Sequence, residues 1–344
     1  MYFASDNSGP VHPDVMQAMA QANQGYAMAY GDDAQMDEAR ARLRDLFEAP
    51  EAAIYLVSTG TAANSLILST LCCPWQTVFC SPVAHIHEDE CNAPEFFTGG
   101  AKLTIVPGGD RMTPEALRAK IEGEENRGVH GPQRGPVSIT QVSERGTVHS
   151  LNQLKALTSV ADDYGLAVHM DGARFANALV KLGCTPAQMT WKLGVDAVSF
   201  GGTKNGCMGV EAVIFFDPAH AWEFELRRKR AAHLVSKHRF LSAQMIGYLS
   251  DDLWLQMARK ANANCARLAV GLRAGGAEFR YEPDANIIYA SLPRRTHQRL
   301  HDAGGVYHLI DGPLAGDPDE MVLMRLVCDW SVTDELIDRF LAAL

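Results

Sequence analysis

Residues 52–68 read AAIYLVSTGTAANSLIL, and they hold the features that decide the fold class. The apolar run 52–57 predicts a short buried strand, followed by a turn of small residues and then by a helix. Backbone N–H groups at such a helix start form an anion site, because Gly60 permits close approach and Thr61 offers a hydroxyl. The motif is neither GxGxxG nor GxxxxGKS/T, which excludes dinucleotide and Walker-type sites. An ordinary capped turn remains open at this point.

Strand-like and helix-like segments alternate outward from this stretch. Further buried strands are predicted at 76–80, 101–107, 136–143, 166–171 and 195–202. Helices are predicted at 62–71, 113–123, 151–165 and 173–183. Such alternation predicts an α/β fold with a mainly parallel sheet.

The pattern changes in the last third of the chain. Residues 226–276 read as helix, including one long helix, and strand-like segments follow at 285–292 and 321–330. The closing segment 333–344 is amphipathic with helical spacing. We therefore expect a large domain at 1–245 and a smaller C-terminal α+β domain at 246–344.

Composition limits the class of function. The 344 residues carry a formal charge of -10, which argues against a partner that is nucleic acid or an anionic membrane surface. We see neither a signal peptide at the start nor eighteen consecutive apolar residues. The eight cysteines form no CxxC pair. Together these features predict a cytoplasmic enzyme with reduced thiols.

Two more strand ends carry reactive side chains. VHMDGAR (168–174) places Asp171 at the carboxyl end of a strand, where α/β sheets bind ligands. The alternative is an N-cap for the following helix, a common role for Asp at such a place. SFGGTKNGCMG (199–209) places Lys204 among glycines, so that its amine can enter a cleft as a nucleophile. The alternative for an isolated lysine is a solvated loop.

The three motifs together match one chemistry. A pyridoxal-phosphate enzyme needs a lysine for the Schiff base, a carboxylate that keeps the pyridine nitrogen protonated, and an anchor for the phosphate. Lys204, Asp171 and the turn at 58–61 supply these parts in a single α/β unit. The combination is far more specific than any of its members.

With these motifs in view, the sequence resembles the low-specificity L-threonine aldolases, pyridoxal-phosphate enzymes grouped with the β-eliminating lyases. The resemblance is carried, in the family's order, by YGDD (30–33), STGTAAN (58–64), AH (84–85), HMDGAR (169–174), FGGTKNG (200–206) and MRLVCDWSVTDEL (324–336). It implies the fold type I of pyridoxal-phosphate-dependent transferases. In that fold the large domain has a mainly parallel seven-stranded sheet.

The resemblance also implies roles for individual residues. Lys204 would form the Schiff base, Asp171 would pair with the pyridine nitrogen, and Gly60 and Thr61 would hold the phosphate. His85 would stack on the ring of the cofactor. The substrate carboxylate would be bound by Arg174, Arg325 and Ser5, and Arg174 would also lie near the cofactor. A neighbouring subunit's site would be approached by Arg239, Tyr30 and Asp32. A homodimer would be the minimal active unit, and a homotetramer is the usual assembly.

The base for the β-hydroxyl proton is left open between His85 and His130, which we expect to act together. HIHEDEC (85–91) puts Asp89 four residues after His85, so a helix there would place both side chains on one face. We therefore expect Asp89 beside His85, with Glu90 and the other residues as bystanders. A metal site is not expected, because HExxH is absent and hard acids beside a thiolate form no coherent ligand set.

The implied activity is that of an aldehyde-lyase, which would cleave L-threonine, L-allo-threonine and related β-hydroxy-α-amino acids reversibly to glycine and an aldehyde. The alternatives are an L-phenylserine aldolase, another pyridoxal-phosphate β-eliminating lyase, or an aminotransferase. The sequence does not separate threonine from allo-threonine or aryl substrates.

Overall fold

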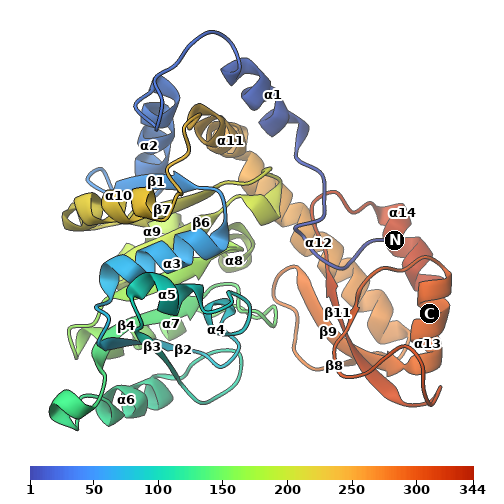
Figure 1. Cartoon of the computed structure of the whole chain (residues 1–344). Coiled ribbons are helices and arrows are strands. Elements are labelled where there is room, and N and C mark those ends of the chain that lie inside the picture. The colour runs from blue at the N-terminus through green and yellow to red at the C-terminus, as the bar shows by residue number, and fades with distance from the viewer.

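Seven strands from the first two thirds of the chain form one sheet in a computed structural model, which describes all residues 1–344 (Figure 1). The strands are β1 (Ala53–Val57), β2 (Gln76–Cys80), β3 (Lys102–Ile105), β4 (Gln133–Thr140), β5 (Val168–Gly172), β6 (Ala197–Gly201) and β7 (Glu211–Phe215). Their order is β1-β7-β6-β5-β4-β2-β3. Only β7 runs antiparallel to its neighbours, so the predicted mainly parallel seven-stranded sheet is confirmed.

Helices connect these strands and cover both faces of the sheet. They are α1 (Pro13–Ala22), α2 (Ala34–Leu46), α3 (Gly60–Leu71), α4 (His85–Glu88), α5 (Ala93–Thr98), α6 (Pro114–Gly123), α7 (Leu151–Asp162), α8 (Phe175–Leu182), α9 (Pro186–Met189), α10 (Ala221–Arg230), α11 (Arg239–Leu249) and α12 (Leu253–Ala274). Single 3₁₀ turns lie at η1 (Gly128–His130), η2 (Trp191–Leu193), η3 (Thr203–Asn205), η4 (Pro218–His220) and η5 (Ser250–Asp252). None of the helices is both long and apolar enough to cross a membrane.

Burial on both faces explains why the strands read as continuous apolar runs. Tyr55 and Val57 of β1 pack with α3 and α10 on one face, whereas Ile54 and Leu56 belong to the larger core on the other face. Successive side chains of a strand point to opposite faces, so β1 contributes to both cores.

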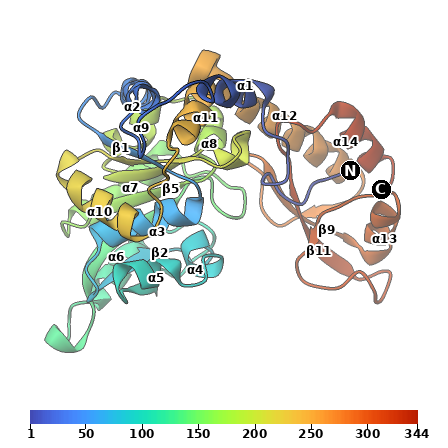
Figure 2. The same cartoon turned by 45° about the horizontal axis from the view of Figure 1, so that its top comes forward.

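A second, antiparallel sheet forms the small lobe (Figure 2). Its strands, in the order β10-β11-β9-β8, are β8 (Glu278–Phe279), β9 (Ile287–Pro293), β10 (His308–Leu309) and β11 (Met321–Val327). The helices α13 (Arg294–Asp302) and α14 (Asp334–Leu341) complete this lobe, which has its own core around Leu268, Ile288, Leu326 and Phe340. The predicted smaller α+β unit is therefore present.

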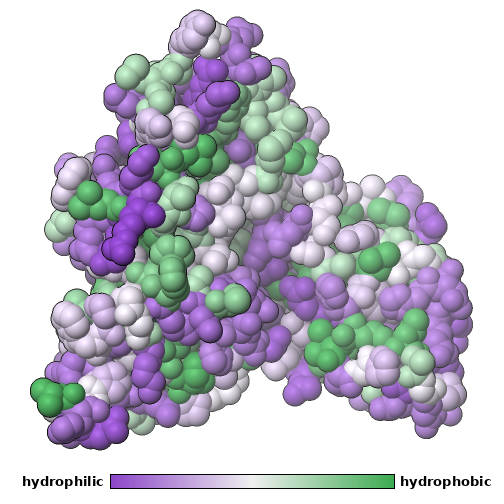
Figure 3. Space-filling view, in the orientation of Figure 1, coloured by the Kyte–Doolittle hydropathy of each residue, from purple (hydrophilic) through white to green (hydrophobic).

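The two lobes share chain segments. Helix α12 contributes Trp254 and Met257 to the large core and Leu268 and Leu272 to the small one. Phe3 from the N-terminal segment also lies in the small core, so the chain begins on the lobe where it ends (Figure 1). The domain division near residue 245 stays a prediction. Hydrophilic side chains gather where the two lobes meet (Figure 3).

Candidate active site

Two adjoining pockets lie where β1, β5 and β6 end. An inner pocket of about 240 Å³ is lined by Gly60, Thr61 and Asp171, among others. An outer pocket of about 330 Å³ opens toward the small lobe and is lined largely by polar and charged side chains. His85 and Lys204 line both pockets, so the two form one continuous site at the sheet edge where α/β proteins bind ligands.

The turn after β1 forms the floor of the inner pocket. Helix α3 begins at Gly60, and the hydroxyl of its N-cap Thr59 accepts the N–H of Ala62 at 3.2 Å. The first backbone bond of the helix runs from Ala63 to Thr59, so the N–H groups of Gly60 and Thr61 precede it and have no partner within the helix. A Cβ at Gly60 would meet nothing within 4 Å. These free N–H groups are of the kind that bind an anion, and the phosphate role of Gly60 and Thr61 stays a prediction.

Asp171 is a buried anion at the end of β5. Its two carboxylate oxygens accept hydrogen bonds from Asn64 Nδ2 at 2.9 Å and from the N–H of Ala173 at 3.0 Å. Burial alone would raise the pKa of Asp171, but the charges of His85 and other neighbours outweigh it and hold the pKa below its ordinary value. Both hydrogen-bond donors are neutral, so the carboxylate lacks a cationic hydrogen-bond partner of the kind that buried charges usually have.

Lys204 sits in η3, directly after β6, and carries no ion pair. Its neighbour Glu211 on β7 is buried and accepts the N–H of Gly202 at 3.1 Å. Burial raises the pKa of Glu211 to about 7. No pattern in the sequence predicted β7 or this carboxyl group, because a single acid inside a short apolar run gives no site signal.

His85 begins α4, and its partner is Glu90, not Asp89. His85 Nδ1 lies 2.8 Å from Glu90 Oε1, and Asn64 Nδ2 lies 2.9 Å from the same oxygen. Helix α4 ends at Glu88 and the chain then turns, which buries Glu90 and leaves Asp89 exposed on the outer pocket that His85 also lines. The predicted place of Asp89 beside His85, near the substrate's β-hydroxyl, stays a prediction. The hydrogen bond to Glu90 raises the pKa of His85.

Glu90 and Asn64 thus join His85 to Asp171 through one buried hydrogen-bond network. Asn64 completes it by accepting a hydrogen bond from Ser199 Oγ at 2.9 Å. The sequence interpretation treated Glu90 as a bystander and did not single out Asn64. Asn64 stands in the STGTAAN motif, on the face of α3 that points toward β5 and β6, and only the tertiary packing reveals that role.

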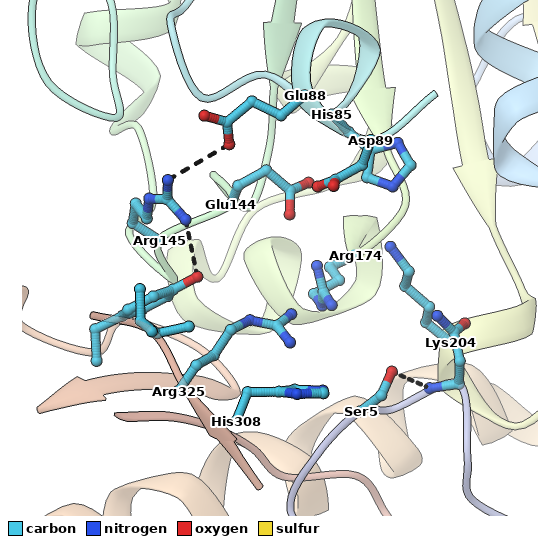
Figure 4. Close-up of a pocket in the computed structure, with 13 residues that line it drawn as sticks. Ser5, His85, Glu88, Asp89, Glu144, Arg145, Arg174, Lys204, His308 and Arg325 are labelled. Atoms are coloured by element: carbon cyan, nitrogen blue, oxygen red, sulfur yellow. Dashed lines mark hydrogen bonds and ion pairs between the residues drawn. The ribbon is translucent and has the colours of Figure 1, made fainter. Parts of the chain in front are cut away.

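The predicted carboxylate-binding residues meet in the outer pocket (Figure 4). Arg174 is buried, and Asp6 accepts hydrogen bonds from its Nε at 2.7 Å and its Nη2 at 3.0 Å. Arg325 of β11 donates to the carbonyl of Ala4 at 3.3 Å, which places it beside Ser5. Asp6, which the sequence interpretation missed, therefore fixes the guanidinium of Arg174 through two of its three nitrogens. The third nitrogen, Nη1, makes no hydrogen bond with Asp6.

Four predicted site residues lie outside the two pockets of this site, and one of them, Asp32, is exposed. His130 ends the exposed turn η1. Tyr30 is exposed, with the Lys229 ammonium 4.9 Å from its ring centre. Arg239 begins α11 and donates to the carbonyl of Gly25 at 3.0 Å. Their assigned roles stay predictions. No group of three or more His, Cys, Asp or Glu side chains is placed to hold a metal ion, so HIHEDEC forms no ligand cluster.

Comparisons with known proteins agree with this geometry. A family model described as Beta-eliminating lyase matches residues 2–292. The low specificity L-threonine aldolase of a Pseudomonas species is 41% identical, over 99% of this chain and 96% of that protein. The threonine aldolase structure of Leishmania major has a TM-score of 0.93 at 25% identity, covering 99% and 97% of the two chains.

A more distant structure shares the fold. It is described as SPT with a PLP internal aldimine and gives a TM-score of 0.70 at 19% identity, covering 100% of this chain and 87% of that one. At this identity the likeness concerns the fold alone. The family model and the relative that is 41% identical establish the family as well as the fold, since together they span nearly the whole sequence. The chain therefore belongs to the beta-eliminating lyase family, as a relative of the low specificity L-threonine aldolases.

Proposed function

We propose that the chain is a pyridoxal-phosphate-dependent aldehyde-lyase. It would cleave L-threonine, L-allo-threonine and related β-hydroxy-α-amino acids reversibly to glycine and an aldehyde. The observation that carries the proposal is the junction of the two pockets at Lys204. The inner pocket holds Asp171 and the start of α3, and the outer pocket holds Arg174 and Arg325. The name of the relative that is 41% identical supports the same activity.

The inner-pocket residues fit pyridoxal phosphate. The open helix start at Gly60 and Thr61 suits a phosphate group. The buried carboxylate of Asp171, held only by neutral donors, suits a protonated ring nitrogen. The amine of Lys204 would hold the cofactor covalently, and His85 would lie over its ring. When bound, pyridoxal phosphate supplies an electron sink that stabilises negative charge at the substrate Cα.

The outer pocket would orient the amino acid for bond cleavage. Arg325, Ser5 and the free Nη1 of Arg174 would bind the substrate carboxylate. The Nδ1–H of His85 would donate a hydrogen bond to Glu90 Oε1, 2.8 Å away, which would leave Nε2 as the ring nitrogen that accepts the β-hydroxyl proton. His130 lies on an exposed turn, so its predicted part would require an assembly of chains.

An assembly of at least two chains is part of the proposal. Tyr26, Met28 and Tyr30 are exposed near Arg239, on a surface that lies outside both pockets. A homodimer as minimal unit, and a homotetramer beyond it, would cover this surface. All eight cysteines are free, which accords with a reducing, cytoplasmic location.

Product analysis tests the function. Incubation with L-threonine and pyridoxal phosphate should release acetaldehyde and glycine in equal amounts. Release of ammonia and a keto acid instead would favour the β-eliminating alternative, and transfer of the amine to an added keto acid would favour the aminotransferase. Faster cleavage of L-phenylserine than of threonine would favour the aryl-specific alternative.

A further inference from the structure

The outer pocket has three chemically different sides (Figure 4). Lys204 stands on one side, and Arg325, Ser5 and His308 stand on a second. The third side carries three acids that the proposed function has not used as a group: Glu88, Asp89 and Glu144. We name these three side chains the acidic wall. Glu88 ends α4, Asp89 follows it, and Glu144 stands in the loop after β4.

The charges of the acidic wall are only partly neutralised. Glu88 Oε2 lies 3.5 Å from Arg145 Nη2, so this acid has a basic partner. Glu144 and Asp89 line the same pocket, and the structure gives neither side chain a hydrogen bond or an ion pair. Glu144 is half-buried, so water screens its charge less than it screens the exposed Asp89.

The loop that carries Glu144 is anchored to the small lobe. Arg145 Nη1 donates to the Tyr289 hydroxyl at 3.0 Å, with the guanidinium 5.3 Å from the centre of that ring. Gly146 has a φ of +86°, and a Cβ there would come 2.7 Å from the carbonyl oxygen of Ile287. These contacts fix the direction in which Glu144 points and keep the Arg145 guanidinium occupied.

An L-amino acid presents an amine, a carboxylate and a side chain on its Cα. Under the proposed function, on which this inference rests, the amine lies at Lys204 and the carboxylate at Arg174 and Arg325. The third substituent then faces the acidic wall. The β-hydroxyl then lies at His85, and the other substituent on Cβ faces Glu144 and Asp89. A carboxylate at that place would meet two acids of like charge that have no hydrogen-bond or ion-pair partner.

We propose that Glu144, assisted by Asp89, determines specificity by excluding substrates with a negatively charged β-substituent. The substrate class is therefore β-hydroxy-α-amino acids with neutral or cationic side chains. In the reverse reaction, the site accepts neutral aldehydes and rejects aldehydes that carry a carboxylate.

An isosteric pair of substrates isolates the charge. The holoenzyme is assayed with L-3-hydroxyasparagine and L-3-hydroxyaspartate, and the readout is the ratio of their kcat/KM values. We expect the wild type to favour the neutral substrate by about tenfold or more, the factor for two unit charges roughly 6 Å apart in a partly solvated site. Glu144→Gln should bring the ratio toward one, and Glu144→Gln with Asp89→Asn should bring it closer still.

Glu115→Gln is the matched control, because it removes one acid from the exposed face of α6 and should leave the ratio unchanged. Competition by L-aspartate and L-asparagine against threonine cleavage gives the same comparison as inhibition constants. A wild-type ratio near one, or a ratio that Glu144→Gln does not change, overturns the inference. Failure of the wild type to cleave threonine would instead overturn the proposed function.

Discussion

Replacing Glu90 with glutamine tests whether this buried acid acts on the reaction through His85. Glutamine keeps the size of the side chain and one oxygen that can accept from both His85 and Asn64, so the perturbation is mainly the loss of charge. The wild-type carboxylate lies 2.8 Å from His85 Nδ1 in a buried position, where charge matters most.

The expected size follows from the kind of hydrogen bond that is lost. A hydrogen bond to a charged group contributes about 1.5–3 kcal/mol and a neutral one about 0.5–1.5 kcal/mol, so Glu90→Gln removes roughly 1–1.5 kcal/mol of support for the protonated imidazole. If His85 takes the β-hydroxyl proton in the transition state, kcat should fall by roughly five- to tenfold.

The pH dependence has a definite sign. The Glu90 hydrogen bond raises the pKa of His85, so losing the charge lowers that pKa again. A base works in its neutral form, so the acid limb of the rate profile should move to lower pH in Glu90→Gln. Steady-state threonine cleavage, with the acetaldehyde followed by coupled reduction across the pH range, measures both effects.

A double-mutant comparison separates positioning from general damage. In a His85→Asn background, Glu90→Gln should have little further effect on kcat, because the group through which it acts is gone. An unchanged acid limb in Glu90→Gln would refute the reasoning, and so would an undiminished effect in the His85→Asn background.

Three further predictions concern buried carboxyl groups. Asp6→Asn leaves the buried Arg174 without its counter-charge and should lower the free energy of unfolding, measured by urea titration, by about 3–5 kcal/mol. The control Glu223→Gln, which breaks an exposed ion pair, should lower it by less than ~1 kcal/mol. The pKa of Glu211 is about 7 in the folded protein and 4.5 in the unfolded chain, so the folded state holds the proton more tightly. The stability that this proton gives to the fold is fully present below pH 4.5 and is lost as the pH rises through 7. Urea titrations of cofactor-free Glu211→Gln should therefore show a gain over wild type that grows from pH 5 to pH 8, and a pH-independent difference would contradict this. Asp171→Asn should weaken pyridoxal-phosphate binding tenfold or more by equilibrium dialysis, because the charged partner of the ring nitrogen is lost; unchanged affinity would contradict that role.

Most of the large sheet was predictable because its strands are buried on both faces. The run at 76–80 coincides with β2, and the predicted helix at 113–123 coincides with α6, whose N-cap is Thr113. Strand β7 was not predicted, since its apolar run is short and the strand begins with the charged Glu211. Helix α13 was missed as well, because its sequence is almost entirely polar and only one side of it is buried.

The site residues that could be predicted also follow from local sequence pattern, whereas those that were missed depend on tertiary packing. Lys204, Asp171 and the α3 turn follow strand ends, and strand ends can be recognised from local pattern. The partners that hold the site residues are distant in sequence: Asp6 meets Arg174 across 168 positions and Asn64 meets Asp171 across 107. Glu90 is close to His85 in sequence, yet its role depends on a helix that stops after four residues, which the i to i+4 argument did not anticipate.

The proposed function depends most directly on Lys204, which would hold pyridoxal phosphate covalently in this pocket. Borohydride reduction of the protein with bound cofactor, followed by peptide mass spectrometry, locates the attachment directly. We expect one pyridoxyl adduct per chain, on the peptide that contains Lys204, and none in Lys204→Ala. An adduct on another lysine, or a Lys204→Ala protein that is labelled as fully as the wild type, would contradict this expectation.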